Sequence, residues 1–310
     1  MSKTDIITIT PKPVTRNRVT RRENLYGWLF AIPWLIGLLL FFSFPLLSSI
    51  YFSFTSYSIL EPGEFVGWQN YRQLFQDDVF WAAVYNTLYF AVFFVPLSIL
   101  FGVALALFLN IKVKGMAVYR TLYFLPTLVP QVALAVLWMW LLNPQFGLVN
   151  GVLNSIGIEG PAWLGSEAWS KPSLILMSLW GIGQSVIIYL AGLHDIPQDY
   201  YDAADVDGAN WLQKIRTITV PLLTPVIFFN LIMGVIGAFQ QFTLPYTLTK
   251  GQGTPANSMM FYVMHLYDNG FKYFKMGYAS AMAWILFIVI MGLTVLIFAT
   301  SKRWVHYQGK

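Results

Sequence analysis

The stretch AAVYNTLYFAVFFVPLSILFGVALALFL, residues 82–109, decides the fold. It contains no Asp, Glu, Lys or Arg, and it is longer than the roughly 20 apolar residues that cross a bilayer as a helix. Hydrocarbon offers no partner for a backbone N–H or C=O, so a spanning segment must pair these groups within itself, as a helix does. We therefore expect a transmembrane helix here.

Five further stretches have the same character, and none shows the alternation of about ten residues that marks a strand of an outer-membrane barrel. The sequence thus predicts an all-α polytopic membrane protein with six transmembrane helices. The six predicted spans are 28–52, 82–109, 121–142, 172–193, 220–245 and 277–300, and together they form one transmembrane domain over 28–300.

The composition supports a membrane protein and excludes several other classes. Of the 310 residues, 57% are hydrophobic and 11% are charged, whereas a soluble domain carries about 25% charged residues. The chain has no cysteine, which excludes disulfides, thiolate zinc sites, iron–sulfur clusters and cysteine nucleophiles. The net charge of +5 is explained below by membrane orientation, so no nucleic-acid partner is expected.

The distribution of basic residues predicts which side of the membrane each loop faces. Lys and Arg are enriched in cytoplasmic loops and tails. With the N-terminal tail (1–27) inside, 14 of the 19 Lys and Arg residues fall on the inner side and five on the outer side. Both the N-terminal tail and the C-terminal tail (301–310) are therefore expected to be cytoplasmic, as is the loop 194–219 in a bacterial inner membrane.

The segment 194–225, HDIPQDYYDAADVDGANWLQKIRTITVPLLTP, is the most informative loop. Asp195 ahead of Pro197 predicts a helix start, because proline suits the first turn and a carboxylate favours the positive helix end. Asp195, Asp199 and Asp202 follow at helical spacing and place carboxylates on one face. The helix is expected to be short and acidic.

A turn and a second helix are predicted to follow. Gly208 permits the left-handed conformation that ends many helices, and Asn210 can cap the next helix. Pro221 is expected to close that second helix at the membrane. This helix–turn–helix elbow suits a partner that carries Arg or Lys. From physics alone, an ordinary solvated loop explains the charges equally well.

The residues themselves carry a resemblance. The string D-A-A-x-x-D-G-A at 202–209, followed by I-x-x-P-L-L-x-P at 218–225, resembles the EAA loop of ABC-transporter permeases. Further matches to the carbohydrate-uptake branch of that family are FVGWQNY (65–71), NTL (86–88), YRTLYFLPTLVP (119–130) and FGLVN (146–150). The resemblance extends from about Tyr26 to Trp304.

The resemblance implies a set of partners and a coupling role for the loop. Such a permease works in the lipid bilayer with a second homologous permease, two cytoplasmic ATPase subunits and an extracytoplasmic solute-binding protein. The first helix of the loop docks on the ATPase. Asp202 stands where the family usually has Glu, which shortens the reach of the carboxylate by one methylene. The implied coupling residues are Asp199, Asp202, Ala203, Ala204, Asp207, Gly208 and Ala209.

Motifs for catalysis are missing from the sequence. There is no G-x-x-x-x-G-K-[ST] phosphate loop, no H-E-x-x-H metal motif and no G-x-S-x-G elbow. We therefore expect no enzyme, no metal site and no cofactor bound by this chain, with ATP and Mg used by the partner ATPase. The predicted spans also lack the ionisable residues of proton-driven or sodium-driven transporters and of voltage sensors, which favours an externally driven path for an uncharged solute.

Uncharged polar residues within the spans are the candidates for contact with that solute. Amides hydrogen-bond sugar hydroxyls, and a tryptophan can stack on a sugar ring. This agrees with ligand sites in general, which combine apolar walls with a few placed polar groups. Gln131 is predicted to lie one turn after Thr127 on the same helix face. Such residues can also simply bond across to neighbouring helices. The candidates are Thr127, Gln131, Trp180, Gly181, Gln184, Asn230, Gln240 and Gln241.

The sequence therefore predicts the transmembrane permease subunit of an ABC importer for a sugar, oligosaccharide or polyol. The alternative is a self-sufficient channel or secondary transporter for an uncharged solute, in which the acidic loop is only a connector. A polytopic membrane enzyme is a third possibility, disfavoured because catalytic side chains do not cluster in the sequence.

Overall fold

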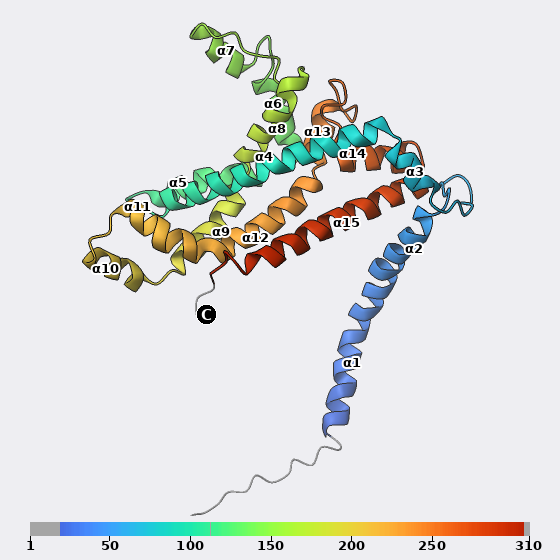
Figure 1. Ribbon diagram of the computed structural model, residues 1–310, viewed down its shortest axis with the longest axis horizontal. Helices are drawn as coiled ribbons and strands as arrows, with labels where there is room; N and C mark the ends of the chain where they lie inside the picture. The colour runs from blue at the N-terminus through green and yellow to red at the C-terminus, as the bar shows by residue number, and fades with distance from the viewer. Residues whose placement is uncertain (1–18, 112, 307–310) are drawn as a thin grey trace, which may run out of the picture. The chain divides into compact units, whose positions relative to one another are not determined.

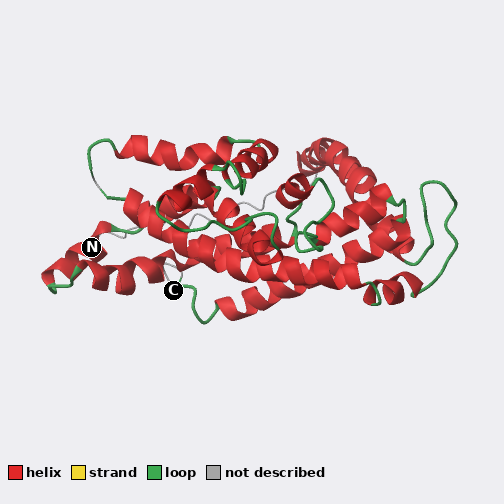
Figure 2. Cartoon of the chain, turned by 90° about the horizontal axis from the view of Figure 1, so that it is seen from above, coloured by secondary structure: helices red, strands yellow, loops and turns green. Residues whose placement is uncertain are grey.

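The computed structural model describes residues 19–111 and 113–306, and within them all regular structure is helical (Figure 2). The described residues contain no strand, apart from one isolated antiparallel bridge between Thr55 and Phe65. The all-α membrane class predicted from the sequence is thereby confirmed. The basic residues of the N-terminal tail before Val19, and Lys310, lie outside the described residues.

The chain divides into two units, 1–51 and 52–310. The first unit contains α1 (Val19–Gly37), the π-helical turn η1 (Leu38–Ser43) and most of α2 (Phe44–Ser53). Together they make one apolar helical run, Glu23–Ser53, whose most apolar part buries no side chain. A surface of this kind is stable only against lipid or another chain.

The second unit is a bundle of helices with short connections. Its elements are α3 (Gln69–Phe75), α4 (Asp78–Leu109), α5 (Met116–Phe124), η2 (Leu125–Leu128), α6 (Gln131–Leu141), α7 (Leu148–Ser155), α8 (Glu167–Trp180), α9 (Gly183–His194), α10 (Gln198–Val206), α11 (Trp211–Lys214), η3 (Ile215–Thr219), α12 (Val220–Phe239), α13 (Thr243–Thr249), α14 (Tyr262–Tyr267), η4 (Asp268–Lys272) and α15 (Met276–Ser301).

The long helices α4, α12 and α15 run along the second unit (Figure 1). Helix α12 packs against α4, α9 and α15, while α4 also contacts α8, α9 and α14. The short helices α10 and α11 lie at one end of this bundle, and α3 and α14 lie at the other (Figure 1). These two ends are called the elbow end and the α14 end below.

Two of the predicted spans are bent rather than straight. The segment made of α5 and η2 meets α6 at 99°, with the break between Leu128 and Gln131, and α8 and α9 meet at 48°. Prolines explain the first break, because Pro126 and Pro130 supply no amide N–H to the helix ladder. Four helical runs of the described residues are long and apolar enough to cross a membrane, and counting each bent pair as one span gives up to six.

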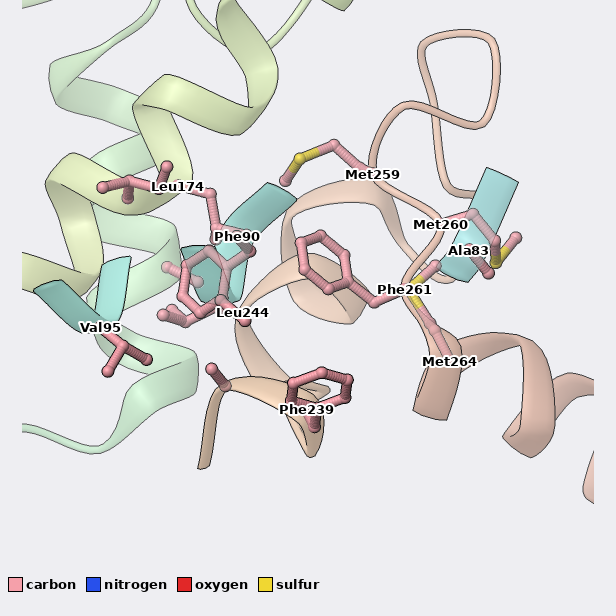
Figure 3. Packing of buried hydrophobic residues seen from close by; sticks show 14 residues of the cluster. Ala83, Phe90, Val95, Leu174, Phe239, Leu244, Met259, Met260, Phe261 and Met264 are labelled. Atoms are coloured by element: carbon pink, nitrogen blue, oxygen red, sulfur yellow. The ribbon is translucent and has the colours of Figure 1, made fainter. Parts of the chain in front are cut away.

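The core of the bundle lies between α4, α8 and the segment that follows α12. Phe90 and Leu174 pack with Phe239, the last residue of α12, and with Phe261 and Met264 from that segment (Figure 3). Buried polar groups bind the same segment to α4. The Nδ2 of Asn86 donates to the carbonyls of Asn257 (2.7 Å) and Met260 (2.9 Å). Residues 251–265 are therefore fixed to the first third of α4.

Candidate functional site

The elbow turns at Gly208, as the sequence predicts. Its φ of 75° is left-handed, a conformation that glycine adopts without strain. The amide of Ala209 donates to the carbonyl of Ala204 (2.9 Å) and that of Gly208 to Asp205 (3.1 Å). This pair of bonds is a Schellman motif, which satisfies the last carbonyls of α10.

Asn210 begins the second helix of the elbow, which confirms its predicted role as a cap. Its Oδ1 accepts from the Gln213 amide (2.9 Å), while Gln213 Oε1 accepts from the Asn210 amide (2.7 Å). These reciprocal bonds form a capping box. Turn and cap lie only two residues apart, so the angle between α10 and α11 is fixed locally.

Two other predictions about this segment are wrong. Asp195 does not start α10 but ends α9, where its amide donates to the Ala191 carbonyl, and Pro197 is the residue before α10. Pro221 does not end the second helix, since the helical run continues from Trp211 to Thr249. The π-helical turn η3 comes directly before Pro221. The proline thus stands at the first turn of α12, where a missing amide costs little.

Side chains brace the elbow from within. Lys214 forms an ion pair with Asp205 across the turn, and the Tyr201 and Thr219 hydroxyls lie 3.0 Å apart. Between these braces and the end of α4 is a cavity of about 590 Å³. The elbow is therefore a preformed element rather than a loose connector.

The outer surface of α10 has no partner within the described chain. The helix buries none of its residues, and Val206 is 89% exposed. Asp202 accepts a hydrogen bond from Gln198 Nε2 (3.1 Å). Among the described residues, no Lys, Arg or His lies within ion-pair distance of Asp199, Asp202 or Asp207.

The small coupling candidates have different positions on the elbow. Ala203 is exposed, whereas Ala204 and Ala209 are half-buried next to the turn. The elbow thus presents three unpaired carboxylates and an exposed apolar side chain together on a rigid support.

A second site is a cavity of about 350 Å³ between α4, α8, α9 and α12. It is called the polar cavity below. Of the eight predicted path residues, it brings together Gly181, Gln184 and Asn230. Asn230 is buried and its Nδ2 donates to the Val226 carbonyl (3.0 Å). The amide oxygen of Asn230 accepts no hydrogen bond from the described residues.

The other five predicted path residues lie elsewhere. The 99° bend falls between Thr127 and Gln131, so the prediction that they share a helix face is wrong. Thr127 Oγ1 donates to the Phe124 carbonyl (2.7 Å), and Gln131 is exposed at the start of α6. Trp180 lines a different, apolar cavity. Gln240 and Gln241 lie just after α12, outside the polar cavity.

Hydroxyl groups missed by the sequence analysis complete the polar cavity. Ser98, Ser178 and Tyr189 line it together with Ser185. Tyr189 is fully buried, and its hydroxyl has no hydrogen-bond partner among the described residues. The signal available in the sequence was spacing, since residues 178, 181 and 185 would share one helix face in a straight helix, although α8 and α9 meet at 48° between them. The cavity therefore offers several polar groups within otherwise apolar walls.

The α14 end carries a separate polar cluster around Asp77. One carboxylate oxygen accepts from the Val79 amide (2.8 Å), and the other lies 3.0 Å from both His265 Nε2 and the Tyr278 hydroxyl. Burial would raise the pKa of Asp77, but the Tyr278 hydrogen bond and the charge of His265 outweigh it and lower that pKa. The cluster joins the first turns of α4 and α15 to α14.

Metal-ligating side chains do not gather in the described part of the chain. No three His, Asp or Glu residues there lie close enough to hold a metal ion. The His265–Asp77 pair is a hydrogen-bonded contact between helix ends.

Comparisons with known proteins agree with this architecture. Residues 98–306 match the family of binding-protein-dependent transport system inner membrane components. The chain is 40% identical to the probable ABC transporter permease protein YesP of Bacillus subtilis, covering 95% of this chain and 96% of YesP. It is 34% identical to SmoG, the sulfoquinovosyl glycerol transport system permease protein of Agrobacterium fabrum, covering 88% of this chain and 89% of SmoG.

A solved structure extends the likeness to three dimensions. A chain in the crystal structure of a bacterial alginate ABC transporter, in complex with an alginate pentasaccharide-bound periplasmic protein, superposes with a TM-score of 0.81. The two are 25% identical over 93% of this chain and 97% of the other. The elbow, the bundle and these matches together show that the chain belongs to the family of inner membrane components of binding-protein-dependent transport systems.

Proposed function

We propose that this chain forms one half of the membrane path of an ABC importer for a sugar, oligosaccharide or polyol. A second, homologous permease forms the other half. An extracytoplasmic binding protein delivers the solute, and two cytoplasmic ATPase subunits use ATP and Mg to drive the cycle. This chain binds no nucleotide and carries out no covalent chemistry.

The observation that carries the proposal is the preformed elbow. Residues 198–214, a segment of 17 residues, contain a Schellman turn, a capping box and an ion pair. A solvated connector does not need this set of interactions. The elbow also exposes Val206 beside unpaired carboxylates, a surface suited to an apolar cleft rimmed with Arg or Lys on the ATPase. Because α11 continues into α12 as one helical run, a displacement of the elbow by the ATPase would also move α12, which lines the polar cavity.

The lining of the polar cavity suits hydrogen bonds to the hydroxyl groups of an uncharged solute. Gln184 and Asn230 supply amides and Tyr189 a hydroxyl, all suited to sugar hydroxyls. The cavity is bounded by α9 and α12, whose relative position an elbow movement would change. Alternating access then follows from movement of α12 against α4 and α9.

The proposed topology places the elbow end in the cytoplasm. The tails 1–27 and 301–310 lie on that side, and the six spans 28–52, 82–109, 121–142, 172–193, 220–245 and 277–300 form the permease domain, with the coupling loop at 194–219. The α14 end then faces the binding protein.

Cysteine cross-linking tests the proposal, since the native chain contains no cysteine. Val206→Cys on the elbow is expected to cross-link to the ATPase subunit in native membranes, while Glu159→Cys, exposed in the α7–α8 connection, is not. A membrane-impermeant thiol reagent should label Val206→Cys in inverted vesicles and Glu159→Cys in intact cells.

Three outcomes would refute the proposal. They are labelling of Val206→Cys from outside the cell, failure of any ATPase to cross-link or co-purify, and solute transport by the purified chain alone. The last would instead establish the self-sufficient channel or secondary transporter.

A further inference from the structure

A lysine lies over two tyrosine rings where α4 and α8 pack together near their first turns. The Nζ of Lys171 is 5.5 Å from the ring centroid of Tyr85 and 5.7 Å from that of Tyr89. Both distances are within the about 6 Å range of a cation–π interaction. The two rings lie 6.2 Å apart, and Phe93 continues the aromatic row at 4.7 Å from Tyr89. We call Lys171, Tyr85 and Tyr89 the cationic platform.

The helix of Lys171 begins earlier than the sequence suggests. The fourth predicted span starts at residue 172, which leaves Lys171 in a loop, but α8 starts at Glu167 and places Lys171 in its second turn. The predicted spans lack ionisable groups, which favours an uncharged solute, but Lys171 places a positive charge at this end of α4 and α8.

The ammonium group of Lys171 lacks a counter-ion within the described chain. None of its ion pairs there involves Lys171. The charge of Glu167, one turn earlier, acts on Lys171, but the two groups are farther apart than an ion pair. A half-buried ammonium has lost part of its hydration, and a cation–π contact returns only about 0.5–1 kcal/mol at such a site. A carboxylate would supply charge-assisted hydrogen bonds to this group.

The rings beneath the ammonium are open to a ligand. Tyr85 is 59% exposed, and Tyr89 and Lys171 are half-buried. An exposed aromatic face suits the apolar face of a sugar ring. Ammonium and rings together therefore match a sugar that carries both an apolar face and an acidic group.

The platform is distinct from the polar cavity but lies on the same side of α8. Lys171 and Ser178, which lines the cavity, are seven residues apart and so share one helix face. Leu174 and Ile175 between them are buried and close off a direct passage. At a rise of 1.5 Å per residue, the platform lies about 10 Å above the cavity along α8.

We propose that the cationic platform is an entry subsite for the carboxylate of an acidic saccharide, such as a uronate. The inference rests on the proposed function, because it names the substrate class of the same path. The carboxylate pairs with Lys171 while the sugar ring lies on Tyr85. When the bundle opens during the transport cycle, the solute passes Leu174 and Ile175 to the polar cavity, which contacts its hydroxyl groups.

Binding to the purified importer complex tests the subsite. The complex is placed in phosphatidylcholine nanodiscs, and digalacturonate and its neutral counterpart galactobiose are titrated by saturation-transfer NMR. The native complex is expected to bind digalacturonate about three- to tenfold more tightly, the range of a partly desolvated charge-assisted contact. Lys171→Gln should abolish this preference, and Lys171→Arg should retain most of it.

Matched variants separate the platform from general electrostatics. Lys275→Gln removes an exposed charge at the α14 end and should leave the preference unchanged. Tyr85→Ala should weaken binding of both sugars, and Tyr85→Phe should not. No preference in the native complex, or an equal loss in Lys275→Gln, overturns the inference.

A lipid could occupy the platform in place of a sugar, and the same assay distinguishes the two. If phosphatidylglycerol in the nanodisc eliminates the preference of the native complex, the platform is a lipid headgroup site and the inference is wrong. Failure of the subsite leaves galactobiose binding and ATPase co-purification intact, whereas failure of the proposed function removes the co-purification itself.

Discussion

Substitution of Gly208 tests how the elbow is held. At this position an added Cβ meets no atom within 4 Å, so the Cβ itself causes no clash. The only cost is conformational, because φ is 75° and a β-branched residue rarely adopts this region. Gly208→Val should therefore disturb the turn and nothing else in the described structure.

The size of the effect follows from the strain. Forcing a non-glycine residue into a sparsely populated backbone region costs about 1–3 kcal/mol. At 1.4 kcal/mol per factor of ten, the native turn becomes about 5- to 150-fold less favoured. The Schellman bonds, one of them donated by the Gly208 amide itself, and the capping box of α11 oppose this change.

The assay is solute-stimulated ATP hydrolysis by the complex in proteoliposomes. Gly208→Val should insert into the membrane normally and lose the stimulation, while retaining the basal hydrolysis of the ATPase. Gly208→Asn is the matched control, since asparagine tolerates left-handed backbone and should keep most of the stimulation. Normal stimulation in Gly208→Val, or equal loss in both variants, would refute the conformational explanation.

Three further predictions follow from the described contacts. The lowered pKa of Asp77 means that its charged form stabilises the fold fully above its ordinary pKa of 3.8, and that this contribution is lost as the pH falls through the lowered value. Asp77→Asn should therefore reduce the Tm at pH 7 and make the Tm fall less steeply below pH 4. An unchanged Tm at pH 7 contradicts this prediction. Gly183→Ala should lower the Tm of the complex in detergent, because the new methyl would lie 2.6 Å from the Tyr123 carbonyl oxygen. Gly237→Ala, where the new methyl meets no atom within 4 Å, should leave the Tm unchanged. Equal Tm values for the two variants would show that α9 shifts freely. Asn230→Ala should lower kcat/KM for uptake about two- to twelvefold, the effect of about 0.5–1.5 kcal/mol from one hydrogen bond. Gln240→Ala, outside the polar cavity, should leave kcat/KM unchanged. A larger loss in Gln240→Ala than in Asn230→Ala would show that the solute does not pass through the polar cavity.

Local sequence rules predicted the elbow well where the interaction is between near neighbours. The Gly208 stop and the Asn210 cap depend on backbone groups within five residues, so their residue types were sufficient. Asp195 was assigned to the wrong helix because a carboxylate before Pro197 can equally end the preceding helix. The helix limit at Pro221 was wrong because the sequence pattern does not reveal a π-helical turn.

Hydropathy predicted the helical class and the approximate places of the apolar helices, because lipid compatibility depends on composition. It could not predict the angles within them. Thr127 and Gln131 are one turn apart only if the helix is straight, and the bend at Pro130 separates them. The polar cavity was only partly predicted, since Ser98 and Tyr189 come from helices whose pairing depends on the tertiary fold.

The close approach at Gly183 suggests a route to inhibitors of the transport cycle. The first turn of α9 rests on the backbone of Tyr123 and the side chain of Thr127, so the two bent helix pairs are in close contact there. An apolar hollow of about 380 Å³, lined in part by Tyr123, Pro126 and Gly183, opens beside that point. A small hydrophobic compound wedged there would hold both bends at a single angle. Such a compound would arrest the importer without competing with its solute or with nucleotide.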